Sequence, residues 1–248
     1  MGLFDFLSKK KKTDYKLFYD TEVHCHILPG IDDGSPDVAT SVELVRQMSD
    51  MGIRRIITTS HVTESTFENT PETIRKAYTE LRSALDAECI EMEIHTSAEY
   101  RMDEFFINQV KENNLLPFPE NYILIENSFF QPFWDIKSLI FDLKLKGYTP
   151  ILAHPERYSY YHNTPNIYKE LHDYGCLFQV NLTSLTGYYY PQVRDVAWKL
   201  LNEGMIDFIG SDIHHIRHIQ HIKEYLQTRE CRKLEEKAAG ILNNKIQF

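Results

Sequence analysis

The sequence predicts an α/β fold in which parallel strands alternate with helices, as a closed barrel or as a doubly wound open sheet. Apolar segments rich in β-branched and aromatic residues alternate with longer segments of helical character. Glycines and prolines mark many of the boundaries between them. Residues 15–248 divided over seven units give about 33 residues each, close to the roughly 30 that a strand–helix–strand unit requires.

Seven short apolar segments predict the strands. Their β-branched and aromatic residues suit a buried, pleated surface. They cover residues 17–26, 54–60, 91–98, 122–126, 150–154, 177–181 and 207–211. Because helices are expected between them, neighbouring strands should run parallel.

Six segments predict helices, and local signals define several of their ends. Ser35 followed by Pro36 is typical of a helix start. Glycines follow four of the helices, where a left-handed residue is expected: Gly52, Gly147, Gly175 and Gly204. The predicted helices cover residues 36–51, 71–87, 134–146, 167–174 and 193–203, with a last one near 218–239.

The length of the chain allows one domain with a single sizeable core, which we predict over residues 15–248. Residues 1–14 predict a flexible basic tail, in which an amphipathic stretch precedes the lysine run 9–12. The alternative for this tail is a weak contact with an anionic membrane surface or an acidic partner. Apolar residues before lysines are the reverse of a secretory signal, and no apolar run could span a bilayer. We therefore expect a cytoplasmic protein with no membrane span.

Charge and cysteine spacing exclude several functions. A net charge of -9 disfavours nucleic-acid binding, which needs an excess of lysine and arginine. The four cysteines include no C-x-x-C pair, so neither a disulfide framework nor a zinc knuckle is indicated. A thiolate tyrosine phosphatase needs an arginine six residues after its cysteine, and those positions hold Ile31, His95, Leu182 and Lys237. A cysteine nucleophile is therefore not expected.

Histidines and carboxylates collect at the C-terminal ends of the predicted strands, where barrel active sites are built. His24 and His26 are two residues apart, so an extended strand directs both to the same side. The candidate metal ligands are His24, His26, Asp33, His61, Glu99, Glu126, His154, Asp212 and His214. These nine groups are too many for one tetrahedral ion, so they predict two or three divalent metals, with manganese, zinc or iron suited to such donors.

Five motifs, in the expected order along the chain, resemble the polymerase and histidinol phosphatase (PHP) superfamily. They are the stretch from His24 to Gly34, Thr59-Ser-His61, Ala98-Glu-Tyr100, Ala153-His-Pro-Glu-Arg157 and Ser211-Asp-Ile-His214. Within the superfamily the sequence is most similar to the bacterial manganese-dependent tyrosine phosphatases of capsule and exopolysaccharide biosynthesis. The resemblance implies a distorted, TIM-like (β/α)7 barrel with three metals.

The resemblance also implies a role for each site residue. One metal would be held by His24, His26, Glu99 and Asp212; a second by Glu99, Glu126 and His154; and a third by Asp33, His61 and His214. Arg157 would bind the phosphate, and Arg217 is the candidate for a second phosphate contact, although its spacing departs from the family pattern. The implied substrate is a phosphotyrosine protein, a bacterial tyrosine kinase of polysaccharide export. The sequence predicts no oligomeric state.

Other functions remain open on the sequence alone. A histidinol-phosphate phosphatase or another PHP phosphoesterase would share the fold and the metals but would need a different pocket. A PHP nuclease is disfavoured by the acidic composition. A non-enzymatic binding module would require an incomplete set of ligands.

Some polar residues near the predicted site have competing interpretations. Glu22 either orients a ligand or has another partner in the strand. His95 is expected in the core, and His215, His218 and His221 on a solvated helix face. Aromatic residues in the loops either pack these loops or form a rim for a phosphotyrosine: Phe129, Phe130, Phe133, Trp134, Tyr158, Tyr160, Tyr161 and Tyr188 to Tyr190.

Overall fold

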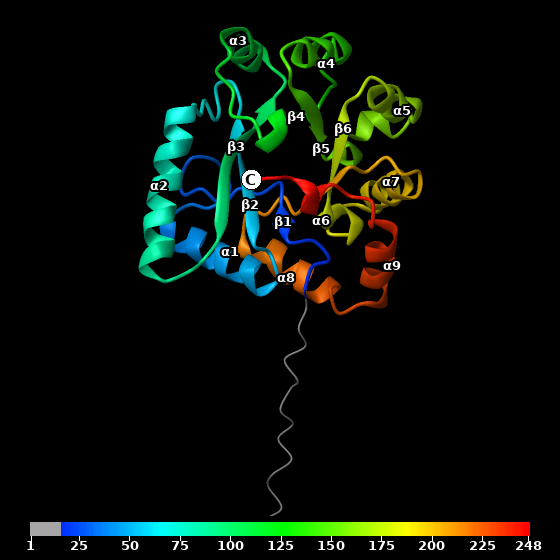
Figure 1. Cartoon of the computed structure of the whole chain (residues 1–248). Helices are drawn as coiled ribbons and strands as arrows, with labels where there is room; N and C mark the ends of the chain where they lie inside the picture. Colours follow the sequence, from blue (N-terminus) through cyan, green and yellow to red (C-terminus); the bar gives the residue numbers. More distant parts are fainter. Residues whose placement is uncertain (1–15) are drawn as a thin grey trace, which may run out of the picture.

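A computed structural model, which describes residues 16–248, contains a sheet of seven parallel strands that neighbour one another in chain order (Figure 1). The strands are β1 (Thr21–Glu22), β2 (Arg55–Val62), β3 (Glu93–Arg101), β4 (Tyr122–Glu126), β5 (Thr149–Ala153), β6 (Leu177–Asn181) and β7 (Phe208–Gly210). A parallel bridge between Cys25 and Ile213 brings the two edges of the sheet together. The predicted (β/α)7 barrel is therefore confirmed.

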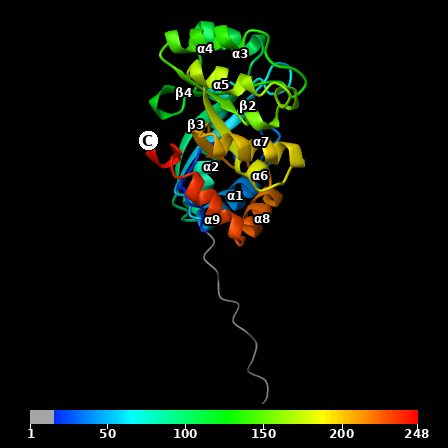
Figure 2. The same ribbon diagram turned by 90° about the vertical axis from the view of Figure 1, so that its right-hand side faces the viewer.

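Helices surround the strands, as the two views show (Figures 1 and 2). They are α1 (Val38–Asp50), α2 (Pro71–Ala87), α3 (Glu104–Glu112), α4 (Ile136–Leu145), α5 (Asn166–Asp173), α6 (Leu182–Leu185), α7 (Pro191–Asn202), α8 (Ile216–Tyr225) and α9 (Arg229–Lys237). In the described part of the chain, no helix is both long and apolar enough to cross a membrane. The tail predicted for residues 1–14 lies outside the described residues.

Several element boundaries follow the sequence signals closely. The bounds of β4, β6 and α2 are those predicted. The four glycines expected after helices have positive φ angles of 99°, 83°, 88° and 69°. α2 begins with a capping box, in which Thr70 and Thr73 bond reciprocally to each other's backbone.

The largest error concerns the first strand, predicted over ten residues but only two residues long. The Glu22 carboxylate accepts hydrogen bonds from the backbone of Val23 and of His24, both at 2.9 Å. Those donors are therefore not available to a regular ladder. The predicted last helix is also wrong as a single element, because Thr228 caps a new helix after α8 has ended. The sequence analysis missed α3 and α6.

The interior of the barrel is apolar toward the N-terminal ends of the strands. A cluster fills it with five residues from β2, β4, β5 and β7 and three from other segments: Val23, Ile57, Phe118, Leu124, Ile151, Ala153, Phe208 and Ile246. The C-terminal residues reach this region, and the C terminus lies near the centre of the view in Figure 1. There the buried Asn243 amide donates to Thr21 O at 2.9 Å and to Ile209 O at 2.7 Å, and accepts from Ile209 N at 3.0 Å. Asn243 thereby joins β1 to β7.

Candidate metal centre

The nine predicted ligands lie together at the C-terminal ends of the strands. Each belongs to at least one group of side chains whose donor atoms all lie within 4.8 Å of one another. The groups are His26, Asp33, His61 and His214; His24, Glu99 and His154; His24, His26 and Asp212; and His61, Glu99 and Glu126. The groups share members, so the structure places the whole predicted set in one continuous site.

Strand ends and sharp turns direct these side chains inward. His61 and Glu99 are paired neighbours in β2 and β3, both of which extend further than predicted. His154 directly follows β5 and has a φ of 34°, and Asp212 has a φ of 53°. Non-glycine residues rarely adopt such angles, and backbone strain of this kind concentrates at functional sites.

Glu99 is the centre of the constellation and is fully buried. Its Oε2 atom lies 3.2 Å from His24 Nε2, 3.4 Å from His26 Nε2 and 3.2 Å from His61 Nδ1. Its Oε1 atom lies 2.9 Å from His154 Nε2. One carboxylate thus contacts four imidazoles from three segments of the chain, which is the geometry expected of a bridging group.

The geometry matches the ligand sets implied by the resemblance only in part. Asp212 Oδ1 lies 3.5 Å from both His24 Nε2 and His26 Nε2, as expected for the first set. Glu126, however, groups with His61 and Glu99, whereas His154 groups with His24 and Glu99. The third implied set, Asp33, His61 and His214, forms one group in the structure, and His26 also belongs to that group.

At three of the candidate ligands, charges of opposite sign counteract the effect of burial on the pKa. Burial would lower the pKa of His24, but the Glu99 and Asp212 carboxylates raise it to about 9. Burial acts the same way on His61, while the carboxylates of Glu99 and Glu126 raise its pKa to about 10. Burial would raise the pKa of Glu99, but His24 and His61 hold it well below its usual value. The Glu99 carboxylate is therefore ionised, and a divalent cation would replace the imidazole protons on binding.

The donor set fits divalent cations. Glu99 Oε2 and His61 Nδ1 are buried without a hydrogen-bond partner, and His24 Nε2 faces His26 Nε2 at 3.3 Å. Burying unsatisfied polar atoms costs free energy unless a ligand satisfies them. Imidazole nitrogen with carboxylate oxygen suits manganese, iron or zinc. Cys25 Sγ instead lies 3.8 Å from Ile57 O, so the nearby thiol is not directed at these groups.

Asp32 is a site residue that the sequence analysis missed by choosing its neighbour. Its Oδ2 atom accepts from His26 Nδ1 at 3.0 Å and from the His61 backbone at 3.2 Å, and its Oδ1 accepts from Gly34 N at 3.0 Å. Burial would raise the pKa of Asp32, but the bond from His26 helps lower it to about 2. The Asp-x-Gly spacing was the available signal, because aspartate commonly bonds to the backbone two residues on.

Arg157 lies over the site, in a short turn after His154. Its NH1 atom donates to Asp212 Oδ2 at 2.8 Å. The guanidinium lies between two rings, 4.7 Å from the centroid of Phe129 and 4.5 Å from that of Tyr189. Ion pair and cation–π contacts together hold the guanidinium plane in one orientation at the site.

The other arginine predicted for phosphate is placed differently. Arg217 is exposed on α8 and is not among the residues that line the cavity at the mouth of the metal site. Arg101, which the sequence analysis did not consider, donates from Nε to Glu126 Oε1 at 3.0 Å. Its position at the end of β3, two residues after Glu99, was the only signal for it.

A cavity of about 440 Å³ opens onto the site. Its lining combines predicted ligands with aromatic residues and two further histidines: Asp33, His61, Glu126, Phe129, His154, Arg157, Tyr188, Tyr189, Asp212, His214, His215 and His218. The predicted aromatic set divides accordingly. Tyr158 and Tyr161 are buried and pack the loops, whereas Phe130 and Trp134 are exposed. The packing role is therefore confirmed for Tyr158 and Tyr161. Phe129, Tyr188 and Tyr189 line the cavity, and their role as a rim for a phosphotyrosine stays a prediction.

Three of the polar residues with uncertain roles are now placed. The Glu22 carboxylate bonds to backbone groups and also accepts from Ser211 N at 3.0 Å, so it joins β1 to β7 without touching a ligand side chain. His95 is partly buried and bonds to Pro117 O at 3.1 Å, away from the site. The solvated position predicted for His218 is wrong, because this side chain is buried and its Nδ1 lies 3.1 Å from Asp212 O.

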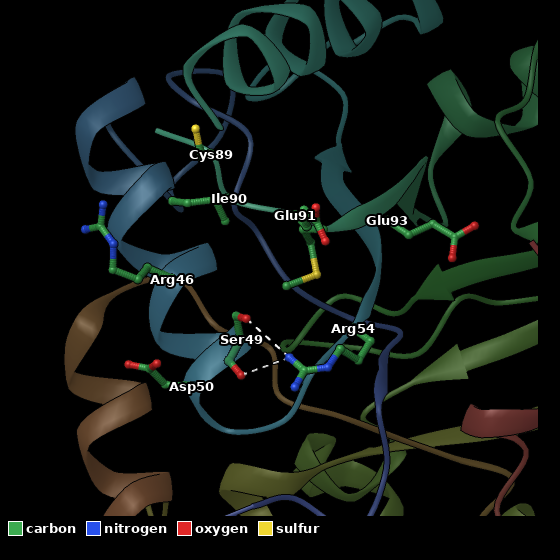
Figure 3. A pocket seen from close by; sticks show the side chains of 9 residues that line it. Arg46, Ser49, Asp50, Arg54, Cys89, Ile90, Glu91 and Glu93 are labelled. Atoms are coloured by element: carbon green, nitrogen blue, oxygen red, sulfur yellow. Dashed lines mark hydrogen bonds between the residues drawn. The ribbon is translucent and has the colours of Figure 1, made fainter. Parts of the chain in front are cut away.

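A second cavity, of about 590 Å³, lies near the C-terminal ends of α1 and α2 (Figure 3). Arg54 donates there to Ser49 O and Oγ, both at 3.4 Å, as the dashed lines show. Arg46 pairs with Glu43 at 2.8 Å and with Glu88. Both arginines thus already donate to neighbouring groups of the protein.

Comparison with known proteins places the chain in a family. The family described as "Capsular polysaccharide synthesis, CpsB/CapC" matches residues 20–244. The chain belongs to this family. Tyrosine-protein phosphatase YwqE of Bacillus subtilis (strain 168) is 34% identical over 197 residues, which are 79% of this chain and 78% of YwqE. Tyrosine-protein phosphatase CpsB of Streptococcus pneumoniae is 28% identical over 202 residues, 79% of this chain and 83% of CpsB.

A solved structure supports the same assignment. One chain from the crystal structures of YwqE and of CpsB, described as unique metal-dependent tyrosine phosphatases, superposes with a TM-score of 0.77. It is 31% identical, and the match covers 92% of this chain and 95% of the solved one. The similarity to phosphatases of capsule synthesis is therefore confirmed at the level of sequence and fold.

Proposed function

We propose that this chain is a metal-dependent protein-tyrosine phosphatase, acting from one domain over residues 15–248. The observation that carries this proposal is the convergence of buried imidazoles on Glu99, beside an arginine and at the base of an aromatic-lined cavity. Family membership supports it, since YwqE and CpsB are named tyrosine-protein phosphatases.

Two or three divalent cations, manganese first and zinc or iron as alternatives, would occupy the centre. His24, His26 and Asp212 would hold one of them, and Glu99 would bridge to the neighbouring groups that contain Glu126 and His154. Asp33, His61 and His214 would hold the third. When bound, these cations supply Lewis acidity that activates water and neutralises charge on the phosphoryl oxygens.

Arg157 would bind the phosphate. A guanidinium has five N–H donors in a planar fork, and the ion pair with Asp212 uses NH1. The remaining donors suit phosphate oxygens, and the permanent charge favours the transition state as negative charge shifts toward the leaving oxygen. Phe129 and Tyr189 keep the guanidinium in place without competing for its N–H groups. Arg217, further out on α8, would contribute a second and weaker electrostatic contact.

The cavity lining favours an aromatic phosphoester. Phe129, Tyr188 and Tyr189 can pack against a phenyl ring while Arg157 holds the phosphate. A phenol has a pKa of about 10, so a phenolate leaving group needs less help from a general acid than an alkoxide leaving group does. The family context suggests the substrate protein, a tyrosine kinase of polysaccharide export, and with it a cytoplasmic location.

Metal-stripped protein tests this function directly. Hydrolysis of a phosphotyrosyl peptide should be absent after metal removal and should return when manganese, zinc, iron or magnesium is added back in turn. Histidinol phosphate, offered at the same metal concentration, should be turned over more slowly. Undiminished peptide hydrolysis after verified metal removal would overturn the proposal, and faster turnover of histidinol phosphate would replace it with the alternative.

A further inference from the structure

Strand β6 supplies none of the nine predicted ligands, yet two of its side chains reach the metal centre. Gln179 and Asn181 are two residues apart, so both point into the barrel, and both are fully buried. Because buried polar groups are normally hydrogen-bonded, the partners of every donor and acceptor of these two amides matter.

The two amides form a continuous chain of hydrogen bonds between His24 and Asp212. His24 Nδ1 lies 2.7 Å from Gln179 Oε1. Gln179 Nε2 donates to Asn181 Oδ1 at 3.0 Å. Asn181 Nδ2 then donates to Asp212 Oδ2 at 2.7 Å. Two residues that belong to one candidate metal group are thereby linked through a strand that contributes no ligand.

The direction of this chain is fixed from its carboxylate end. An ionised carboxylate only accepts hydrogen bonds, so Asp212 requires the NH₂ group of Asn181. The Asn181 carbonyl oxygen then faces Gln179 and requires its NH₂ group. Gln179 is left with its carbonyl oxygen toward His24, so His24 Nδ1 carries a proton. Nε2 is therefore the His24 nitrogen whose lone pair faces the other ligands.

A further contact supports this orientation of the Gln179 amide, and a glycine provides the space for the amide. The His154 backbone N–H, which can only donate, bonds to the Gln179 backbone carbonyl at 2.7 Å and also lies 3.3 Å from the same Gln179 Oε1. Gly210 allows the close approach, because a Cβ there would lie 2.7 Å from Gln179 Nε2 and 2.5 Å from His24 Cβ. Neither constraint depends on Asn181.

We propose that Gln179 and Asn181 are positioning residues that fix the metal-facing nitrogen of His24 and hold Asp212 beside it. This inference rests on the proposed function, since it requires cations at the centre. Groups that hydrogen-bond to metal ligands set ligand orientation and tautomer, and their loss typically weakens metal binding by about 10- to 100-fold.

Titration of metal-stripped protein with manganese alone, followed calorimetrically, tests the proposal without using activity. Gln179→Met removes the acceptor and the donor while keeping the length of the side chain, and should raise the manganese Kd by about 10- to 100-fold. Asn181→Leu should raise it by about 10-fold or more. Both substitutions break the same series of hydrogen bonds. The double variant should therefore have a manganese Kd close to that of whichever single variant binds manganese more weakly.

Two controls separate positioning from packing. Gln179→Glu keeps an oxygen toward His24 and the His154 N–H, so it should bind manganese more tightly than Gln179→Met does. Val180→Ala alters the same strand within the surrounding core and should lower thermal stability while leaving the Kd unchanged. If Gln179→Met folds and binds manganese as the parent does, or binds it at least as well as Gln179→Glu does, Gln179 only fills space and the proposal fails. A parent chain that binds no manganese would overturn the proposed function together with it.

Discussion

The two ends of the barrel interior bury polar side chains in opposite ways. At the N-terminal end, Asn243 is fully buried, and its amide makes three hydrogen bonds to Thr21 and Ile209 amid an apolar cluster. At the C-terminal end, Glu99 is equally buried, yet its Oε2 atom faces three imidazole nitrogens and has no hydrogen-bond partner. Asn243 has its hydrogen bonds satisfied within the fold, whereas the unsatisfied Glu99 oxygen is an acceptor that the cations of the proposed function would satisfy.

This difference predicts that the two ends respond to different substitutions. Substitutions at the N-terminal end should lower the free energy of unfolding and leave metal binding per folded molecule unchanged. Substitutions at the C-terminal end should lower metal content and activity and should change the free energy of unfolding of the metal-free protein only slightly.

The largest expected effect comes from Glu99→Gln. The amide keeps the shape of the side chain but lacks the charge that a bridging ligand supplies, so turnover of a phosphotyrosyl peptide should fall by roughly 10³-fold or more. Elemental analysis should show fewer metal ions per chain, while metal-free protein still unfolds cooperatively. Full metal content with normal turnover would remove Glu99 from the centre.

Phe208→Ala makes the complementary change in the apolar cluster. Phe208 is fully buried and packs edge-on against Tyr122 at 5.6 Å between centroids. The cavity should cost about 3–5 kcal/mol in the free energy of unfolding, measured by denaturant titration of metal-free protein. Phe208→Leu should cost less, and metal content per folded chain should match the parent in both variants. A specific loss of metals would mean that the two ends are not independent.

Arg157→Ala divides the C-terminal end into metal assembly and phosphate recognition. We expect kcat/KM to fall by roughly 10²-fold, about 3 kcal/mol, with metal content close to that of the parent. Arg157→Lys should recover part of this loss, because an ammonium keeps the charge but not the fork. Loss of metals in the Ala variant would instead assign Arg157 a structural role through Asp212.

The smallest effect is expected for Arg217→Ala. The side chain is exposed on α8 and does not line the cavity, so kcat/KM should fall by no more than about tenfold and less at high salt. Steady-state kinetics at two ionic strengths would measure this. A loss equal to that of Arg157→Ala would show that α8 moves toward the phosphate when substrate binds.

The convergence of the candidate ligands could be predicted from sequence because their positions follow from local rules. Spacing by two places His24 and His26 on one side of the chain, and the C-terminal ends of parallel strands meet at one end of a barrel. The bounds of β4 and β6 could also be predicted from local sequence, because each is a short apolar segment between polar or helical segments.

The supporting residues could not be predicted because their roles depend on partners distant in sequence. Asp32 bonds to the His61 backbone, 29 residues away, and Gln179 contacts His24, 155 residues away. The Asp-x-Gly spacing at Asp32 indicates a turn but not the contacts with His26 and His61, and nothing in the local sequence distinguishes Gln179 from other polar strand residues. The predicted length of β1 is wrong for a related reason. The backbone N–H groups of Val23 and His24 donate to the Glu22 carboxylate, whereas the apolar pattern predicts that they donate to a neighbouring strand.

Anomalous diffraction from crystals grown with manganese tests the central claim most directly. The contrast between the two ends predicts two or three manganese peaks at the C-terminal end, each about 2.0–2.3 Å from imidazole or carboxylate atoms of the nine residues, with Glu99 shared between two of them. The N-terminal end, around Asn243, should show none. Crystals of protein that is active with manganese but shows no peak at Glu99 would contradict the account.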